Sequence, residues 1–182
     1  IGILLPNGIL NNSSDTDSRK SILDHISVDA MISLPNRSFK FAKANACTGI
    51  LFGHKGGQKA KYIFMGIPEE IGYERVTQYA TEIKQNDLIP LLNSYKDYCV
   101  NRDLYENRTE EYIVLSKSPM AFLLRSDLFT DKRFDASYYF SEYVYKSEIA
   151  DECVRLSEYA VLSNRTLDEV IKPTKYIEIS NV

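Results

Sequence analysis

The sequence predicts an α/β fold: a mixed, mostly parallel sheet that ends in an antiparallel hairpin and is followed by a mainly helical appendage. Three observations predict it. Continuous apolar runs, which are typical of strands buried on both faces of a sheet, end at Pro or Gly. A segment with helical spacing separates the first two runs, whereas the third and fourth are too close together for a crossover helix.

The first 35 residues form the predicted strand–helix–strand unit. Ile1–Leu5 is the first apolar run, and Pro6-Asn7-Gly8 follows it as a turn. Apolar residues then recur at helical spacing until about Ser27. Residues 28–35 form a second apolar run that ends at a proline, so we expect the two strands to be joined by one crossover.

The third and fourth apolar runs, residues 46–55 and 61–67, are only about six residues apart. Parallel neighbours need a connection of a dozen or more residues, so we expect these two runs to pair as an antiparallel hairpin. The segment between the second and third runs is polar, basic and aromatic, with no clear period. It is predicted to be a loop.

A short amphipathic helix is expected after residue 86. Asn86 is a possible N-cap, Pro90 falls in the first turn, and one helix face would carry the apolar residues. Those residues are Leu88, Leu91, Leu92 and Tyr95. The charged, turn-rich stretch from residue 100 to 110 suggests a boundary, which gives predicted parts at residues 1–98 and 111–182.

The second part begins with strand-like segments at residues 111–117 and 121–124 and continues into a tyrosine-rich stretch. That stretch is predicted to be helical through Leu156, and an extended segment closes the chain. Aromatic residues at this density favour a packing face over a base-stacking platform. They would also suit an interface with another part of a larger protein.

Charge is distributed unevenly along the chain. Residues 1–67 carry a net charge of +4 and residues 68–182 carry −7. Between residues 35 and 61 there are six basic residues and no acidic one, which favours contact with a phosphate backbone. The alternative is a solvated basic loop.

Several function classes are excluded or disfavoured. Three cysteines spaced about fifty residues apart suit reduced thiols in the cytoplasm, and neither they nor His25 and His54 have the spacing of a zinc site. No apolar run is long enough to cross a membrane. Without a glycine-rich phosphate loop or a nucleophile elbow, we do not expect a freestanding enzyme. The chain has no initiator Met, and we expect it to be part of a longer polypeptide.

A set of short motifs resembles a known family. The chain has Leu5-Pro6-Asn7-Gly8 at the end of one strand, Leu34-Pro35 at the end of the next, and a loop with Phe39 and Phe41. The strand Thr48–Phe52 follows, with Lys55 after it. This order resembles the C-terminal part of the adenine-specific DNA methyltransferase domain in the methylation subunits of type I restriction-modification systems. The family has Ser where this chain has Gly49, and the two phenylalanines leave the loop alignment open by two residues.

The resemblance implies a role for this loop. Phe41 or Phe39 would face an adenine flipped out of the DNA, and Arg37, Lys40 and Lys43 would meet adjacent phosphates. Lys55 would add a further DNA contact.

The resemblance also implies what the chain lacks. The family's cofactor loop and its catalytic Asn-Pro-Pro-Phe/Tyr motif precede the strand that begins here at Ile1. S-adenosylmethionine is therefore expected in the parent enzyme but not in this chain, which would be inactive alone. Residues 1–98 would be the end of the methyltransferase-type sheet, and residues 111–182 would lead toward a DNA-recognition region.

Expected partners are DNA and the specificity and restriction subunits or domains. The alternative is a protein–protein docking module of a multisubunit DNA-modifying complex. The basic loop favours the first hypothesis, and the aromatic tail favours the second.

Overall fold

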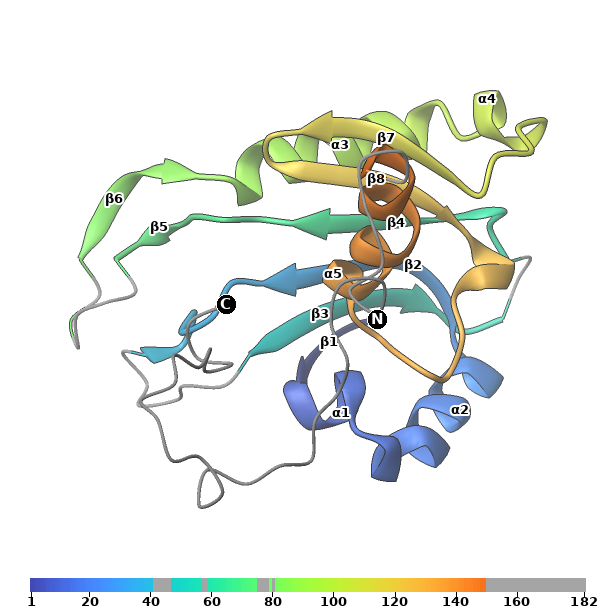
Figure 1. Ribbon diagram of the computed structural model, residues 1–182, viewed down its shortest axis with the longest axis horizontal. Helices are drawn as coiled ribbons and strands as arrows, with labels where there is room; N and C mark the ends of the chain where they lie inside the picture. The colour runs from blue at the N-terminus through green and yellow to red at the C-terminus, as the bar shows by residue number, and fades with distance from the viewer. Residues whose placement is uncertain (41–46, 57–58, 75–78, 80, 150–182) are drawn as a thin grey trace, which may run out of the picture. The chain divides into compact units, whose positions relative to one another are not determined.

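A six-stranded sheet forms the centre of the protein in the computed structural model (Figure 1). The structure describes residues 1–40, 47–56, 59–74, 79 and 81–149. The strand order is β1-β3-β2-β4-β8-β7. These strands are β1 (Gly2–Pro6), β2 (Ser27–Leu34), β3 (Thr48–His54), β4 (Tyr62–Ile67), β7 (Tyr112–Lys117) and β8 (Met120–Arg125). A separate ribbon pairs β5 (Ile71–Tyr73) with β6 (Glu82–Asn86).

Helices pack on both faces of this sheet. Residues 1–148 form one compact unit, and residue 149 is the only described residue of a second unit. The longer helices are α2 (Thr16–His25) and α3 (Leu88–Val100). The short ones are α1 (Asn7–Asn11), η1 (Ser13–Asp15), α4 (Asp103–Glu106), η3 (Ser126–Leu128), α5 (Ala136–Tyr139), η4 (Phe140–Tyr145) and α6 (Lys146–Ile149).

The predicted α/β class and the mixed sheet are confirmed, but the sheet is not mostly parallel. Only β2 and β4 form a parallel pair, and the other neighbouring strands of the sheet are antiparallel. β1 and β2 do run in the same direction, as the crossover prediction requires. However, β3 lies between them and is antiparallel to both.

The predicted hairpin between the third and fourth apolar runs is wrong. β3 pairs with β1 and β2, whereas β4 pairs with β2 and β8. The two strands are antiparallel to each other, but β2 separates them. The end of β3 and the start of β4 are therefore about two strand spacings, roughly 10 Å, apart.

β1 is also less buried than its apolar sequence predicts. Leu5 is the strand's one buried residue, and half of Leu4 is exposed, because β1 lies at an edge of the described sheet. β2 agrees better with the prediction, because most of its residues are buried, whichever face of the sheet they point to.

Two apolar clusters occupy the two faces of the sheet. Successive residues of β2 point to opposite sides, so Met31 joins the cluster with Leu10 of α1 and Tyr139 of α5. Its neighbours Ala30 and Ile32 join the cluster beneath α3. The amphipathic prediction for α3 is confirmed. The N-cap is Asp87 rather than the predicted Asn86, although the Asn86 side chain accepts a hydrogen bond from the Leu88 amide at 3.1 Å.

Residues 112–125 form two strands, as predicted, but these strands extend the main sheet rather than belonging to a separate appendage. β7 and β8 pair with each other, and β8 pairs along its length with β4. Ala121 to Leu124 are fully buried, which explains why this segment belongs to the core.

The tyrosine-rich segment that follows is helical from residue 136 to residue 149, as predicted. Tyr139 and Val144 are buried, and the Tyr139 ring contacts those of Phe129 and Tyr143. The packing interpretation is therefore confirmed for the described residues. The predictions for residues 150–182 lie outside them.

Candidate functional site

A cleft of about 580 Å³ with a partly polar lining lies at one end of the sheet. β1, β2 and β4 run in the same direction, and their carboxyl ends all lie at this end of the sheet. The cleft is lined by residues that follow these three strands, by the start of β3 and by the start of α5. In open α/β sheets, ligands bind outside the carboxyl ends of such strands, so the position favours a ligand site.

The walls of the cleft carry hydrogen-bonding groups rather than a cluster of one charge. Its polar lining residues are Asn7, Asn11, Ser33, Asn36, Thr48, Glu69, Asp135 and Ser137. Asn11 donates a hydrogen bond to Asn7 at 2.9 Å. The hydroxyl oxygen of Thr48 is buried and has no hydrogen-bond partner among the described residues. Amides and hydroxyls of this kind suit a polar ring or a ribose better than a metal ion.

Ser33, at the end of β2, joins this strand to the first turn of α5. Its hydroxyl donates to the Asp135 carboxylate at 2.8 Å and accepts from the Ala136 amide at 2.9 Å. Asp135 also accepts from the Ser137 amide at 3.0 Å, which caps the helix. These bonds hold one wall of the cleft in place.

Asp87 holds in place the wall of the cleft that follows β4. Its side chain is buried, and it accepts hydrogen bonds from the amides of Glu69 at 2.9 Å and Glu70 at 2.8 Å. The chain after Pro68 is therefore fixed beside the cleft by a residue that directly precedes α3.

A turn after β2 places basic residues beside the cleft. Pro35 and Asn36 line it, and the Lys40 amide donates to the Arg37 carbonyl oxygen at 3.0 Å. Arg37 is exposed and has φ of 64°, a left-handed conformation that costs a non-glycine residue about 1–2 kcal/mol. Phe39 is half-buried in the same turn.

The structure brings some of the predicted site residues together and separates another. Arg37, Phe39 and Lys40 share the turn beside the cleft, whereas Phe41 and Lys43 lie outside the described residues. Lys55 follows the far end of β3, because Thr48 pairs with Leu34 and His54 pairs with Ser27. The basic residues between 35 and 61 therefore do not form one surface.

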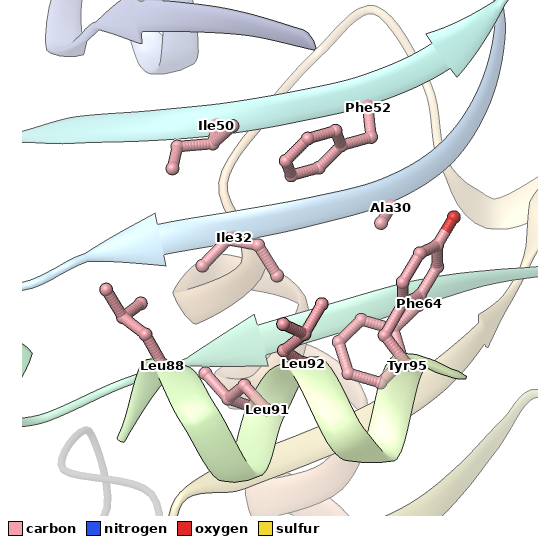
Figure 2. Close-up of a pocket in the computed structure, with 9 residues that line it drawn as sticks. All are labelled: Ala30, Ile32, Ile50, Phe52, Phe64, Leu88, Leu91, Leu92 and Tyr95. Atoms are coloured by element: carbon pink, nitrogen blue, oxygen red, sulfur yellow. The ribbon is translucent and has the colours of Figure 1, made fainter. Parts of the chain in front are cut away.

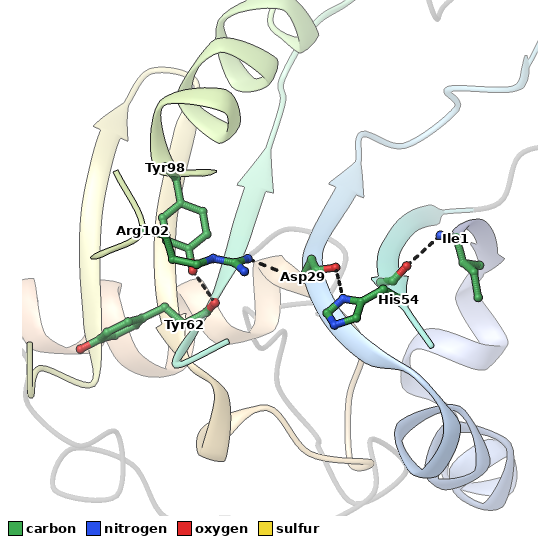
Figure 3. Close-up of polar contacts among 7 residues, drawn as sticks. Ile1, Asp29, His54, Tyr62, Tyr98 and Arg102 are labelled. Atoms are coloured by element: carbon green, nitrogen blue, oxygen red, sulfur yellow. Dashed lines mark hydrogen bonds and ion pairs between the residues drawn. The ribbon is translucent and has the colours of Figure 1, made fainter. Parts of the chain in front are cut away.

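A second polar cluster lies at that opposite end of the sheet (Figure 3). Asp29 has no partner in the ladder between β2 and β3, where the register shifts, and its carboxylate reaches two side chains. It lies 2.8 Å from Nδ1 of His54 and 3.5 Å from the guanidinium of Arg102. No sequence pattern indicates this cluster, because its members are distant in the chain.

The tyrosine beside Arg102 completes the cluster. The guanidinium carbon lies 5.5 Å from the centre of the Tyr98 ring, and the Tyr98 hydroxyl donates to the Tyr62 carbonyl oxygen at 2.7 Å (Figure 3). Burial raises the pKa of Tyr98 above its usual value. This hydroxyl therefore stays protonated and serves packing rather than proton transfer.

Two other features were not found among the described residues. No group of three His, Cys, Asp or Glu side chains among them is placed to hold a metal ion. None of the described helices is long and apolar enough to span a bilayer.

Comparison with protein-family models matches residues 1–120 to the family described as N-6 DNA Methylase. The chain belongs to this family. The match covers β1, β2, β3, β4 and β7 of the sheet and ends at the first residue of β8. It confirms the resemblance to adenine methyltransferases in the sequence. A comparison with curated proteins gave no significant match.

Solved structures similar to this N-6 DNA methylase chain include the methyltransferase subunit of a type I restriction-modification system from Streptococcus thermophilus. Sequence identity is 17%, the TM-score is 0.44, and the match covers 69% of this chain and 23% of that one. A structure reported for the assembly and conformational transition of the type I R-M system gives 13% identity and a TM-score of 0.47. It covers 87% of this chain and 35% of that one, so the chain spans about a third or less of either relative.

Proposed function

We propose that this chain forms the wall facing DNA and the target base in an adenine methyltransferase of a type I restriction-modification system. The observation that carries the proposal is the cleft at the carboxyl ends of β1, β2 and β4 in a chain of the N-6 DNA methylase family. A flipped adenine presents an amine donor and ring nitrogen acceptors, which amides and hydroxyls such as those of Asn7, Asn36 and Ser137 can match.

The turn after β2 supplies the remaining parts of such a site. Arg37 and Lys40 would neutralise phosphates beside the extruded nucleotide, and the ring of Phe39 or Phe41 would stack on the base. The cleft itself carries Glu69 and Asp135, so the duplex would lie against the basic turn, and the nucleotide alone would enter the cleft.

S-adenosylmethionine would supply the methyl group in this chemistry. The described lining of the cleft does not fit this cofactor, because no glycine is among the residues that line it. We therefore assign the cofactor to the parent enzyme and no cofactor contact to this chain. The chain alone is inactive in this proposal.

DNA and the specificity and restriction subunits are the proposed partners of the parent enzyme. Residues 111–182, which begin with β7 and β8 of the sheet, would lead toward DNA recognition.

The test compares methylation with DNA binding in the full-length protein that contains this chain. Phe41→Ala and Phe39→Ala are each assayed for transfer of a tritiated methyl group to DNA. One of them should lower methylation by at least about tenfold, since stacking of a base on an aromatic ring contributes roughly 1–3 kcal/mol. DNA affinity should change little, because phosphate contacts hold the duplex.

Tyr145→Ala is the matched control, because this aromatic ring is half exposed and lies outside the cleft. It should retain methylation. Melting temperatures are measured for all variants, since a phenylalanine that serves only packing would lose folding and activity together. Full methylation by both phenylalanine variants would show that the turn does not contact the adenine.

A further inference from the structure

Asp135 brings a carboxylate into the cleft from beyond the region that matches the methylase family. The family match ends at residue 120, whereas Asp135 directly precedes α5 and lines the cleft. The described lining residues include one other acidic residue, Glu69, and no Lys, Arg or His. The cleft therefore presents negatively charged acceptors, which favour a ligand that carries N–H donors.

An apolar groove elsewhere in the molecule lacks such acceptors. It has a volume of about 220 Å³ and lies between α3 and β3 (Figure 2). Tyr95 is the one residue of its described lining with a polar side-chain atom. The donors and acceptors of a nucleobase would remain unpaired there, so the groove does not compete with the cleft for such a ligand.

One oxygen of the Asp135 carboxylate accepts all the hydrogen bonds that this side chain makes with described residues. Oδ1 accepts from the Ser33 hydroxyl at 2.8 Å and from the Ser137 amide at 3.0 Å. Oδ2 has no hydrogen-bond partner within the described part of the chain. A helix cap needs only one acceptor oxygen. The second oxygen is therefore available to a ligand in the cleft.

The backbone on both sides of Asp135 is fixed. Its neighbours in the chain, Phe134 and Ala136, are both fully buried. The Phe134 amide donates to the carbonyl oxygen of Leu10 at 2.8 Å, which joins this segment to α1. The Ser33 side chain that holds Oδ1 is buried as well. An acceptor that is fixed in advance loses little conformational entropy when a ligand binds.

We propose that Oδ2 of Asp135 accepts a hydrogen bond from the exocyclic amine of an adenine in the cleft, and that this contact selects bases with an amine. A base with hydrogen in place of the amine leaves the carboxylate without its donor, which weakens binding. Arg37 and Lys40 belong to the turn beside the cleft and not to its lining, so neither replaces that donor. The inference rests on the proposed function, because it takes adenine as the ligand.

The test titrates the 182-residue chain with adenosine and with purine riboside, which has hydrogen in place of the amine. Dissociation constants are measured from the NMR shifts of the backbone amides of Ala136 and Ser137. Adenosine should bind at least about fivefold more tightly than purine riboside. Asp135→Asn should reduce this preference to less than about twofold. Asparagine still caps α5 through its side-chain oxygen, but it turns an NH₂ donor toward the amine.

Asp127→Asn is the matched control, because it removes a carboxylate that is 63% exposed and lies outside the cleft. It should retain the preference for adenosine. Asp135→Ser keeps a capping hydroxyl but has no second oxygen, so it replaces the asparagine variant if that variant fails to fold. Circular dichroism confirms that each variant is folded.

Two results overturn the inference. One is the absence of saturable adenosine binding, and the other is a preference that Asp135→Asn and Asp135→Ser leave unchanged. The methylation assay of the Phe39 and Phe41 variants tests the proposed function separately. If a phenylalanine variant loses methylation while Asp135→Asn keeps the preference, Asp135 is not the acceptor but the proposed function stands.

Discussion

The guanidinium of Arg19, on α2, donates a hydrogen bond to the carbonyl oxygen of Asp131, which lies 112 residues later in the chain. Arg19 is only 1% exposed. It also donates to the carbonyl oxygens of Ile9 at 3.0 Å and Asn12 at 2.9 Å, and to the Thr16 hydroxyl at 3.0 Å. One side chain therefore ties the first two helices to the segment that leads into α5.

Replacing this side chain should destabilise the whole unit. Arg19→Met keeps most of the volume but leaves buried carbonyl oxygens without donors, so we expect a loss of about 3–5 kcal/mol in the free energy of unfolding. Urea denaturation measures it. Lys20→Met is the control. Lys20 is the exposed neighbour of Arg19, so this change should alter the free energy of unfolding by less than about 0.5 kcal/mol. Similar urea midpoints for Arg19→Met and Lys20→Met would contradict the stabilising role of Arg19.

Gly53 is required by a close approach of two strands. A Cβ atom at this position would lie 2.5 Å from the Ser27 carbonyl oxygen and 2.6 Å from the Ile26 side chain. Because backbone cannot move aside cheaply, Gly53→Ala should cost about 1–3 kcal/mol. Gly8→Ala in α1 meets only flexible side-chain atoms and should be neutral or stabilising. Thermal melting compares the two, and equal melting temperatures would disprove the backbone clash.

Local patterns in the sequence were sufficient for several elements. The spacing of Leu88, Leu91, Leu92 and Tyr95 predicts the face that α3 turns to the sheet, because helical period is a property of neighbouring residues. The apolar runs likewise predict β2, β3 and β4 as strands. Strand order could not be predicted from local patterns, because the insertion of β3 between β1 and β2 depends on pairing across the whole domain.

The same limit applies to the candidate site. The motifs indicated the ends of β1 and β2, and both line the cleft. Ser33 and Asp135 are 102 residues apart, so no spacing rule could join them. At Gly49, where the family has Ser, a Cβ would lie 2.4 Å from the terminal methyl group of Met31, so this flexible side chain would have to move to accommodate a serine.

Tyr139 should make stability depend on alkaline pH. Its hydroxyl donates to the Arg133 carbonyl oxygen at 3.0 Å and accepts from the Thr130 amide at 3.2 Å. Burial raises the pKa of Tyr139 to about 12 from the usual value of 10. The neutral form is thus favoured in the folded state, so its contribution is complete below pH 10 and is lost as pH rises from 10 to 12.

That loss is on the order of 2–3 kcal/mol for a shift of this size. Urea denaturation at pH 9 and pH 11.5 measures it, with Tyr139→Phe as the comparison. The variant should be less stable at pH 9, because two hydrogen bonds are gone, but its decline with pH should be shallower. Tyr145→Phe is the control, since this residue is half exposed. Parallel declines in the Tyr139→Phe variant and the unchanged protein would contradict the assignment.

We expect Arg37→Gly to raise the stability of the fold and to lower its affinity for DNA. Its φ of 64° favours glycine, so Arg37→Gly removes backbone strain and should stabilise the fold by about 1 kcal/mol. The same change removes a positive charge from the turn beside the cleft. In the full-length protein, DNA affinity should therefore fall, and the slope of log K against log salt should decrease in magnitude by about 0.9, as expected for one phosphate contact.

The opposite signs of these two effects distinguish the proposed role from a purely structural one. A surface arginine with no DNA contact would show the gain in melting temperature alone, with the salt slope unchanged. Lys96→Gly is not a suitable control, because glycine would weaken α3, so Lys96→Gln is used to remove an exposed charge from that helix. It should leave both the slope and the affinity as they are. If Arg37→Gly and Lys96→Gln lower affinity equally, the turn has no special position on the DNA, and the attraction is only the general field of the protein.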